Sequence, residues 1–272
     1  KNVSNKKLAE SDDHKIITTI GLHIPINTNI KGFVKNGDLQ INKLRGSVDL
    51  KTESVDTELN NLSGNIVFNT KGGNINIKKT NGTIRLNVIS GDIDIMQCEG
   101  NIFTSIENGI IKLKKIKGEI KSATTLGDIE ISYFDGKQCS FDINVGNLIA
   151  RHCNSDFKVN IDIGDITMND VKGNATLFTG KGQINMNNII GNTRCNSNFG
   201  NISGNNLFGS IIANSELGDL IINKGYNSFL KDHNIDLSAN RGSVSLRLPS
   251  DLPFFIKTHC DNLNSKDAIT SE

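Results

Sequence analysis

The sequence predicts an all-β protein that folds as a single parallel β-solenoid (β-helix) of about eleven coils, each of 18 residues with two short strands. Two observations predict this fold. Glycine recurs at multiples of nine residues from Gly37 onward, and the residues after each glycine alternate between polar and apolar. Such alternation, bounded by turn residues, is typical of a half-buried strand. Strands this short bury their apolar face only by stacking on copies of themselves, so a solenoid is expected.

The glycine series has one inserted residue and two substituted positions. It runs in steps of nine to Gly136 and resumes at Gly146, one residue late, so the insertion in Phe134–Gly146 is expected to bulge outward. Val55 and Ser155 stand where further glycines would fall. The nonapeptides form two alternating classes, one that reads Gly-Asp/Asn-Ile-x-Ile and a looser one that often ends in Thr. The true period is therefore eighteen residues.

The core is expected to consist of four inward columns that repeat once per coil. Each column places similar apolar residues above one another, which gives a solenoid a continuous core. The columns begin at Leu39, Ile41, Leu44 and Val48.

The two ends of the chain depart from the repeat. Residues 1–14 are expected to be extended or disordered, residues 15–260 to form the solenoid domain, and residues 261–272 to form a frayed tail. Caps are expected at about 15–36 and 227–260, with Gly242–Leu246 as a final strand, because a solenoid must protect its open strand edges.

Two segments carry a resemblance to a known family. His23-Ile24-Pro25-Ile26-Asn27-Thr28, followed by Gly37-Asp38-Leu39-Gln40-Ile41 and serial Gly-Asp-Ile-x-Ile coils, and the strand Ser245–Pro249, resemble the toast-rack adhesin family. These are bacterial β-strand-repeat domains of unknown function, with eukaryotic relatives that include mitochondrial proteins. The resemblance covers about residues 15–260 and implies the solenoid fold, but it brings no catalytic residues.

Aspartates recur at one position just after the turn glycine, and clustered acids are the catalytic groups of carbohydrate-active β-helix enzymes. The aspartates are Asp38, Asp92, Asp128, Asp165 and Asp219. Asn74, Asn147 and Asn201 occupy the same position, which an acid catalyst would not tolerate, so these side chains are expected to accept backbone N–H bonds in their turns. The calcium-binding β-roll repeat is also missing. No catalytic residue, cofactor or metal site is predicted.

The cysteines are expected to be free thiols that pack as small apolar groups. Cys98 and Cys153 share an inward column but lie three coils, roughly 14 Å, apart, which is too far for a disulfide. This cysteine usage favours a reducing compartment. His152 precedes Cys153 directly, and neighbours in a strand point to opposite faces, so the two residues are not expected to chelate a metal as a pair.

Charge and hydropathy exclude two classes of partner. The 30 Lys+Arg and 29 Asp+Glu give a net charge of +1, which predicts no nucleic-acid partner, and no stretch approaches the roughly 20 apolar residues of a membrane span. A local basic run and the insertion are the predicted partner contact surface. Its residues are Lys112, Lys114, Lys115, Lys117, Phe134 and Lys137.

The predicted function is a non-enzymatic, rigid scaffold that binds other macromolecules, above all proteins, as an accessory subunit of a larger assembly. One alternative is an adhesin-like protein of the bacterial cell envelope, and a second is a carbohydrate-active β-helix enzyme. Glycan binding has weak support, because the chain has no Trp and its only tyrosines are Tyr133 and Tyr226. The free thiols and the eukaryotic relatives favour the mitochondrial matrix, with the cell envelope as the alternative.

Overall fold

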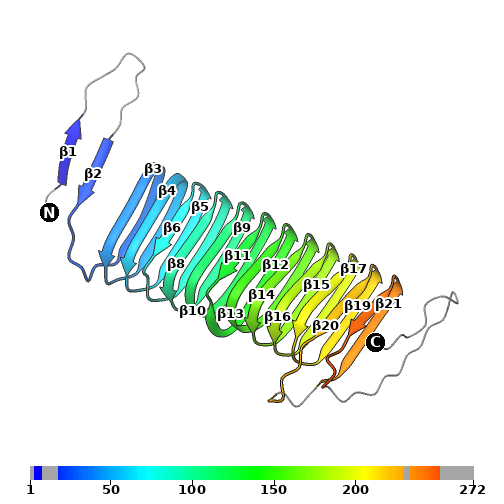
Figure 1. The fold of residues 1–272 in the computed structure, drawn as a ribbon. Coiled ribbons are helices and arrows are strands. Elements are labelled where there is room, and N and C mark those ends of the chain that lie inside the picture. The colour runs from blue at the N-terminus through cyan, green and yellow to red at the C-terminus, as the bar shows by residue number, and fades with distance from the viewer. Residues whose placement is uncertain (1–2, 8–17, 230–232, 252–272) are drawn as a thin grey trace.

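The computed structural model describes residues 3–7, 18–229 and 233–251, and within these residues the chain is all-β (Figure 1). The strands are β1 Val3–Lys7, β2 Thr18–Leu22, β3 Ile30–Leu44, β4 Val48–Leu62, β5 Ile66–Gly72, β6 Ile75–Lys78, β7 Ile84–Ser90, β8 Ile93–Glu99, β9 Ile102–Asn108, β10 Ile111–Leu126, β11 Ile129–Ser132, β12 Asp135–Val145, β13 Leu148–Ile163, β14 Ile166–Lys172, β15 Ala175–Lys181, β16 Ile184–Ile190, β17 Thr193–Phe199, β18 Ile202–Leu207, β19 Ile211–Leu217, β20 Leu220–Lys224, β21 Ile235–Arg241 and β22 Val244–Arg247.

Strands β3 to β22 form a parallel β-solenoid, and Figure 1 shows its coils following one another along a single axis. Each strand pairs with the equivalent strand of the next coil, so Ile75 lies beside Ile93 and Ile93 beside Ile111. Residues 18 apart are therefore neighbours in space over most of the solenoid. Across the insertion the separation is 19 residues, as between Ile129 and Leu148, and in the last coil it is 24, as between Ile211 and Ile235. The prediction of a parallel solenoid with an 18-residue period is confirmed.

Each coil has two sides that carry strands and one short side. In one coil, β6 forms the first side, Lys79 turns the chain onto the short side, Gly82 turns it again, and β7 forms the second side before Gly91. The long strands β3, β4, β10 and β13 run through a corner without a break.

The four predicted inward columns lie in the core. Their residues are buried, apart from Leu39, which is only partly buried because it belongs to the first coil. Two further inward columns were not predicted. The second side turns three side chains inward instead of one, beginning with Val48, Leu50 and Thr52. Some members of these columns are polar and bond to one another, as where Thr104 Oγ1 donates to Ser122 Oγ at 2.7 Å.

The glycine series has two physical causes. Gly91 has a φ of 131°, a conformation that side chains disfavour, and a Cβ atom there would collide with the backbone carbonyl oxygen of Gly73 in the preceding coil. The same collision recurs at most glycines of the series, so close stacking of the coils requires glycine at these corners.

The corner after the first side is built without glycine. Ten residues there adopt the left-handed conformation, with φ between 52° and 58°. They are Lys43, Asn61, Lys79, Gln97, Lys115, Tyr133, His152, Asp170, Asn188 and Asn206. We call this column the left-handed corner. The sequence does not reveal this column, because Lys, Gln and Tyr, which occupy five of the ten positions, are not enriched in this conformation.

The ends of the solenoid differ in part from the expected caps. Within the segment 15–36, β2 pairs with β1 in an antiparallel hairpin that Figure 1 shows apart from the coils, whereas Ile30–Val34 already pair with Val48–Thr52. The predicted final strand corresponds to β22, which pairs with β20. The predicted tail 261–272 and the cap residues 252–260 lie outside the described residues, as do residues 1–2 and 8–14, so the capping function stays a prediction.

Candidate interaction surfaces

Half of the predicted basic run is neutralised by acidic residues of neighbouring coils. Lys112 in β10 lies between Asp94 of the preceding coil and Glu130 of the following one. Lys117 forms an ion pair with Glu99, with Nζ and Oε1 3.5 Å apart. These two lysines therefore contribute little net charge to the surface, a balance that the linear sequence does not show.

The other half of the run belongs to a larger basic surface. Lys114 and Lys115 have uncharged neighbours in both adjacent coils, and two coils earlier the same positions hold Lys78 and Lys79. Together with two residues of the first coil they form a surface that we call the basic corner. Its members are Lys43, Arg45, Lys78, Lys79, Lys114 and Lys115.

The basic corner is regular along the axis of the solenoid. Lys43, Lys79 and Lys115 are exposed and lie two coils apart, which at the usual strand spacing is roughly 10 Å. From Asn42 to Lys115 the two columns that hold these lysines contain no Asp or Glu. The sequence does carry a signal for this surface, because the Lys-Lys pair at 78–79 recurs at 114–115. The two pairs lie 36 residues apart, so a single 18-residue coil contains only one of them.

The insertion places its two predicted contact residues on opposite sides of the chain. Lys137 is exposed beside a β-bulge, where the register of β12 shifts between Asp135 and Gln138. Phe134 is only 1% exposed and belongs to an inward column of the core. The prediction that Phe134 contacts a partner was therefore wrong, because the bulge lies after this residue and not at it.

The recurrent Asp and Asn side chains connect adjacent coils. Asp92 Oδ1 accepts the backbone N–H of Ile110 at 2.9 Å, and Asp128 Oδ1 accepts that of Asn147 at 2.7 Å. The prediction that these side chains accept backbone N–H bonds is confirmed for all of them except Asp38, but the donor lies in the next coil and not in the same turn. The backbone N–H and the side-chain hydroxyl of Ser243 both donate to Asp219 Oδ1 and lower the pKa of Asp219. The column is interrupted at Ile110, which has no side-chain acceptor.

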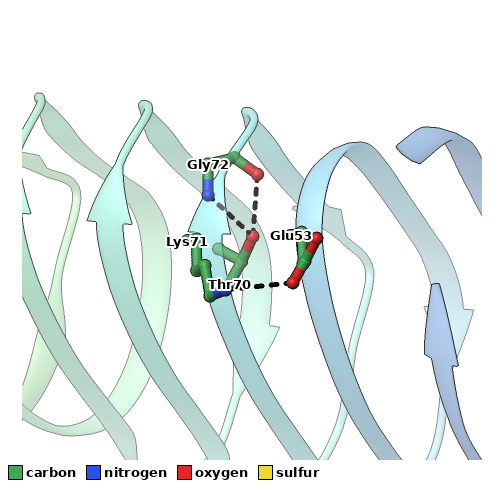
Figure 2. A network of polar contacts seen from close by, with 4 residues as sticks. All are labelled: Glu53, Thr70, Lys71 and Gly72. Atoms are coloured by element: carbon green, nitrogen blue, oxygen red, sulfur yellow. Dashed lines mark hydrogen bonds and ion pairs between the residues drawn. The ribbon is translucent and has the colours of Figure 1, made fainter. Parts of the chain in front are cut away.

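A separate polar network lies beside a glycine corner near the N-terminal end (Figure 2). Lys71 Nζ contacts Glu53 Oε1 at 3.0 Å and thereby lowers the pKa of that carboxyl group. Thr70 Oγ1 donates to the Gly72 carbonyl oxygen at 2.7 Å and accepts the Gly72 N–H at 3.2 Å. These groups satisfy one another, so the network stabilises the corner and leaves little capacity for a ligand.

The thiols within the described residues are free and buried. They are Cys98, Cys139, Cys153 and Cys195. Burial raises the pKa of each, for Cys153 to about 11, so all four are protonated near neutral pH. The prediction of free, buried thiols is confirmed for these four, whereas Cys260 lies outside the described residues.

His152 and Cys153 point in different directions, as predicted. Cys153 is buried, whereas the half-exposed ring of His152 stacks on Tyr133 with 5.1 Å between ring centroids. His152 Nδ1 also lies 3.2 Å from Asp170 Oδ2 of the next coil. All three of these polar residues belong to the left-handed corner.

Comparison of the chain with protein-family models, with curated proteins and with solved structures finds no match. Within residues 3–7, 18–229 and 233–251, no three His, Cys, Asp or Glu side chains are placed to hold a metal ion. Nor does this part of the chain contain a helix long and apolar enough to cross a membrane.

Proposed function

We propose that the protein is a non-enzymatic, rigid scaffold that binds another protein through the basic corner. The observation that carries this proposal is the regular array of lysines at Lys43, Lys79 and Lys115, with Lys78 and Lys114 beside the last two. Among the described residues, no carboxylate forms an ion pair with any of these five side chains. Like charges held in a row on a fixed backbone are available for an oppositely charged partner.

The partner that fits this array is a protein with an extended acidic segment or an acidic face. Exposed ion pairs each contribute little, so affinity comes from engaging several lysines at once and falls as salt screens them. The parallel hydrogen bonds between coils hold the lysine spacing, which removes one cost of binding that a flexible basic tail would bear. Such a rod would serve as an accessory subunit of a larger assembly.

The two alternatives have less support in the geometry. A carbohydrate-active enzyme would need free carboxylates in a groove, whereas the recurrent aspartates are engaged with backbone N–H groups of the next coil. An adhesin-like envelope protein remains compatible with the same rod, and the basic corner would then face an acidic glycan.

The test is affinity purification of the protein from its native source, followed by mass spectrometry, with two matched variants. In the first, Lys78, Lys79, Lys114 and Lys115 are replaced by Gln, a residue that the left-handed corner already accepts at Gln97. In the second, the same change is made at Lys51, Lys121, Lys158 and Lys172, which lie elsewhere on the surface.

A stoichiometric acidic partner should bind the wild type and the second variant, and binding to the first variant should fall by about tenfold or more. Equal loss in both variants would mean that only net charge matters. A wild-type chain that returns alone would contradict the scaffold, and a glycan array would then test the adhesin alternative.

A further inference from the structure

A row of exposed apolar side chains lies in the C-terminal half, at the last position of the second side before the glycine corner. Its members are between 36% and 50% exposed: Leu126, Val145, Ile163, Phe199 and Leu217. Strand pairing makes them neighbours in successive coils, interrupted once by Lys181. We call this row the apolar ridge. Five coil steps at the usual strand spacing give it a length of roughly 24 Å.

The apolar ridge is not a consequence of the fold. In the N-terminal half the same column is polar or small: Asn36, Ser54, Gly72, Ser90 and Asn108. The coil therefore folds equally well with polar residues at this position. Contiguous exposed apolar surface on a monomer marks interaction sites, whereas single exposed apolar residues do not.

Carboxylates border the apolar ridge on both sides. Asp162 and Glu216 directly precede ridge residues, and the aspartates of the glycine corner follow two residues after them at Asp128, Asp165 and Asp219. Lys181 within the row and Arg241 beyond its end are the cations in the same column. Two copies of this chain that met ridge to ridge would bring these carboxylates together, and like charges at an interface cost binding energy. The charge pattern therefore favours a basic partner over a second copy.

An open hollow of about 480 Å³ lies at one end of the apolar ridge. Leu126, Val145 and Ile110 supply its apolar lining, and the carboxylates of Asp92 and Asp128 lie at its border. Ile110 interrupts the Asp/Asn column here, so the lining is apolar where the other coils present a polar side chain. This combination suits a Lys or Arg side chain, whose stem packs on apolar groups while its head reaches a carboxylate.

We propose that the apolar ridge docks an extended segment of another protein whose apolar residues, flanked by Lys or Arg, all point to one face. About seven extended residues span its length. Because successive side chains of an extended segment point to opposite faces, these residues occupy every second position. The apolar side chains of the segment cover the ridge, and its cations pair with the bordering carboxylates, one of them in the hollow. This proposal goes beyond the basic corner, because it concerns another column of the coil and a partner of the opposite charge.

The test uses a fluorescently labelled nine-residue peptide, Lys-Ser-Leu-Ser-Leu-Ser-Leu-Ser-Lys, titrated with the full chain and followed by anisotropy. In this Leu–Lys peptide the Leu and Lys side chains share one face of the extended chain. Replacing Ile163 by Thr and Phe199 by Ser should weaken binding by about tenfold or more, because both side chains lie within the apolar ridge. Ile221→Thr is the matched control. Ile221 is 46% exposed, close to the 47% of Ile163, but lies on the first side of the coil, and its replacement should leave binding unchanged.

The charge component is tested by Asp128→Asn together with Asp165→Asn. Asn keeps the oxygen that accepts the N–H of the next coil, so the fold is preserved while two negative charges are removed. Peptide binding should weaken about threefold and depend less on salt. A Leu–Glu peptide, with Glu in place of both Lys residues, should not bind, and neither should a peptide with Ser in place of every Leu.

Three results would overturn the proposal. The first is peptide binding that the ridge substitutions leave unchanged, and the second is equal binding of the Leu–Glu peptide. The third is concentration-dependent self-association of the chain that Ile163→Thr abolishes, because the ridge would then be an interface between copies. Replacing Lys78, Lys79, Lys114 and Lys115 of the basic corner by Gln should not weaken binding of the Leu–Lys peptide, so this test is independent of the proposed function.

Discussion

The two halves of the rod are built from the same repeating coil and share one continuous core, but the columns of side chains that point outward differ between them. Up to Lys117 the left-handed corner carries lysines, and the column that precedes the glycine corner is polar. Beyond Lys117 the left-handed corner carries aromatic, acidic and amide side chains, and the other column becomes the apolar ridge. Burial of the inward columns stabilises the fold, so the residue types in the outward columns vary without disrupting it. A solenoid of this kind therefore presents different surfaces along its axis, to which each coil contributes one residue per column.

The left-handed corner shows the same contrast at the level of single contacts. In the C-terminal half its side chains bond to one another, as where Asn188 Nδ2 donates to Asp170 Oδ1 at 2.6 Å. In the adjacent outward column Asn205 Nδ2 donates to Asn187 Oδ1 at 3.0 Å. In the N-terminal half, lysines at equivalent positions have no such partners among the described residues. A column that satisfies itself stabilises the rod, whereas a column of like charges is available for a ligand.

The largest expected effect is a difference in stability between a glycine substitution in a central coil and one in an end coil. Gly127→Ala should lower the free energy of unfolding by about 3 kcal/mol, because the new Cβ would meet the carbonyl oxygen of Gly109 in addition to an unfavourable φ of 144°. Gly37→Ala should cost only about 1 kcal/mol, because Gly37 has a φ of 124° but no heavy atom within 4 Å of the new Cβ. Urea unfolding of the two variants measures the difference. Equal losses would show that φ strain, not stacking, requires the glycines.

The next effect concerns one inward column, which holds Leu44 near the N-terminal end and Lys224 near the C-terminal end. Lys224 is 5% exposed, and its Nζ donates to the carbonyl oxygens of Leu207 at 3.0 Å and Gly209 at 2.7 Å. Burial lowers its pKa from 10.5 to about 8. Between these values the folded chain binds fewer protons than the unfolded chain, so stability should rise with pH, by at most about 1.4 kcal/mol per pH unit.

Lys224→Met should remove this rise, and the comparison with the wild type from pH 7 to 10 isolates it from other titrating groups. Lys172→Met, at an exposed lysine of the C-terminal half, is the matched control. If both variants kept the wild-type slope, the ammonium group of Lys224 would not be desolvated in the folded state.

The smallest effect concerns the boundary between the two halves. Ile110 interrupts the Asp/Asn column there, and Ile110→Asn would place an acceptor beside the backbone N–H of Asp128. The substitution should raise the free energy of unfolding by about 1 kcal/mol, the usual contribution of one such bond, measured as an increase in Tm. Ile110→Ala supplies the comparison without an acceptor. An equal Tm for the Asn and Ala variants would show that these bonds between coils add nothing.

Much of the fold was predictable because its causes are local and repeated. The glycine spacing identified the corners, the alternation after each glycine identified the strands, and together they placed Cys98 and Cys153 correctly in the core. The left-handed corner was not predictable in this way. Residues such as Lys115 and Tyr133 have no preference for a φ near 55°, and only the closure of the coil imposes it.

The candidate surfaces were predictable only in part. The predicted basic run contained Lys114 and Lys115 of the basic corner. It also contained Lys117, which forms an ion pair with Glu99 of the preceding coil. The insertion was identified, but the inward position of Phe134 depends on the place where the register shifts. The charge balance and the position of the bulge depend on residues of the adjacent coil, which lie 18 or 19 positions away in the sequence. A short run of consecutive residues therefore does not reveal them.

The sequence by itself determined the period, the glycine corners with the strands that follow them, and four of the inward columns, because each follows from a pattern within nine or eighteen residues. The tertiary structure alone decided which outward side chains meet. Stacking converts a separation of 18 residues into contact between adjacent strands, so a lysine pair, a neutralised run and the apolar ridge appear only once the coils are in register. The physical reason is that hydrogen bonds between coils fix the fold, while outward side chains acquire their chemistry from the coils above and below.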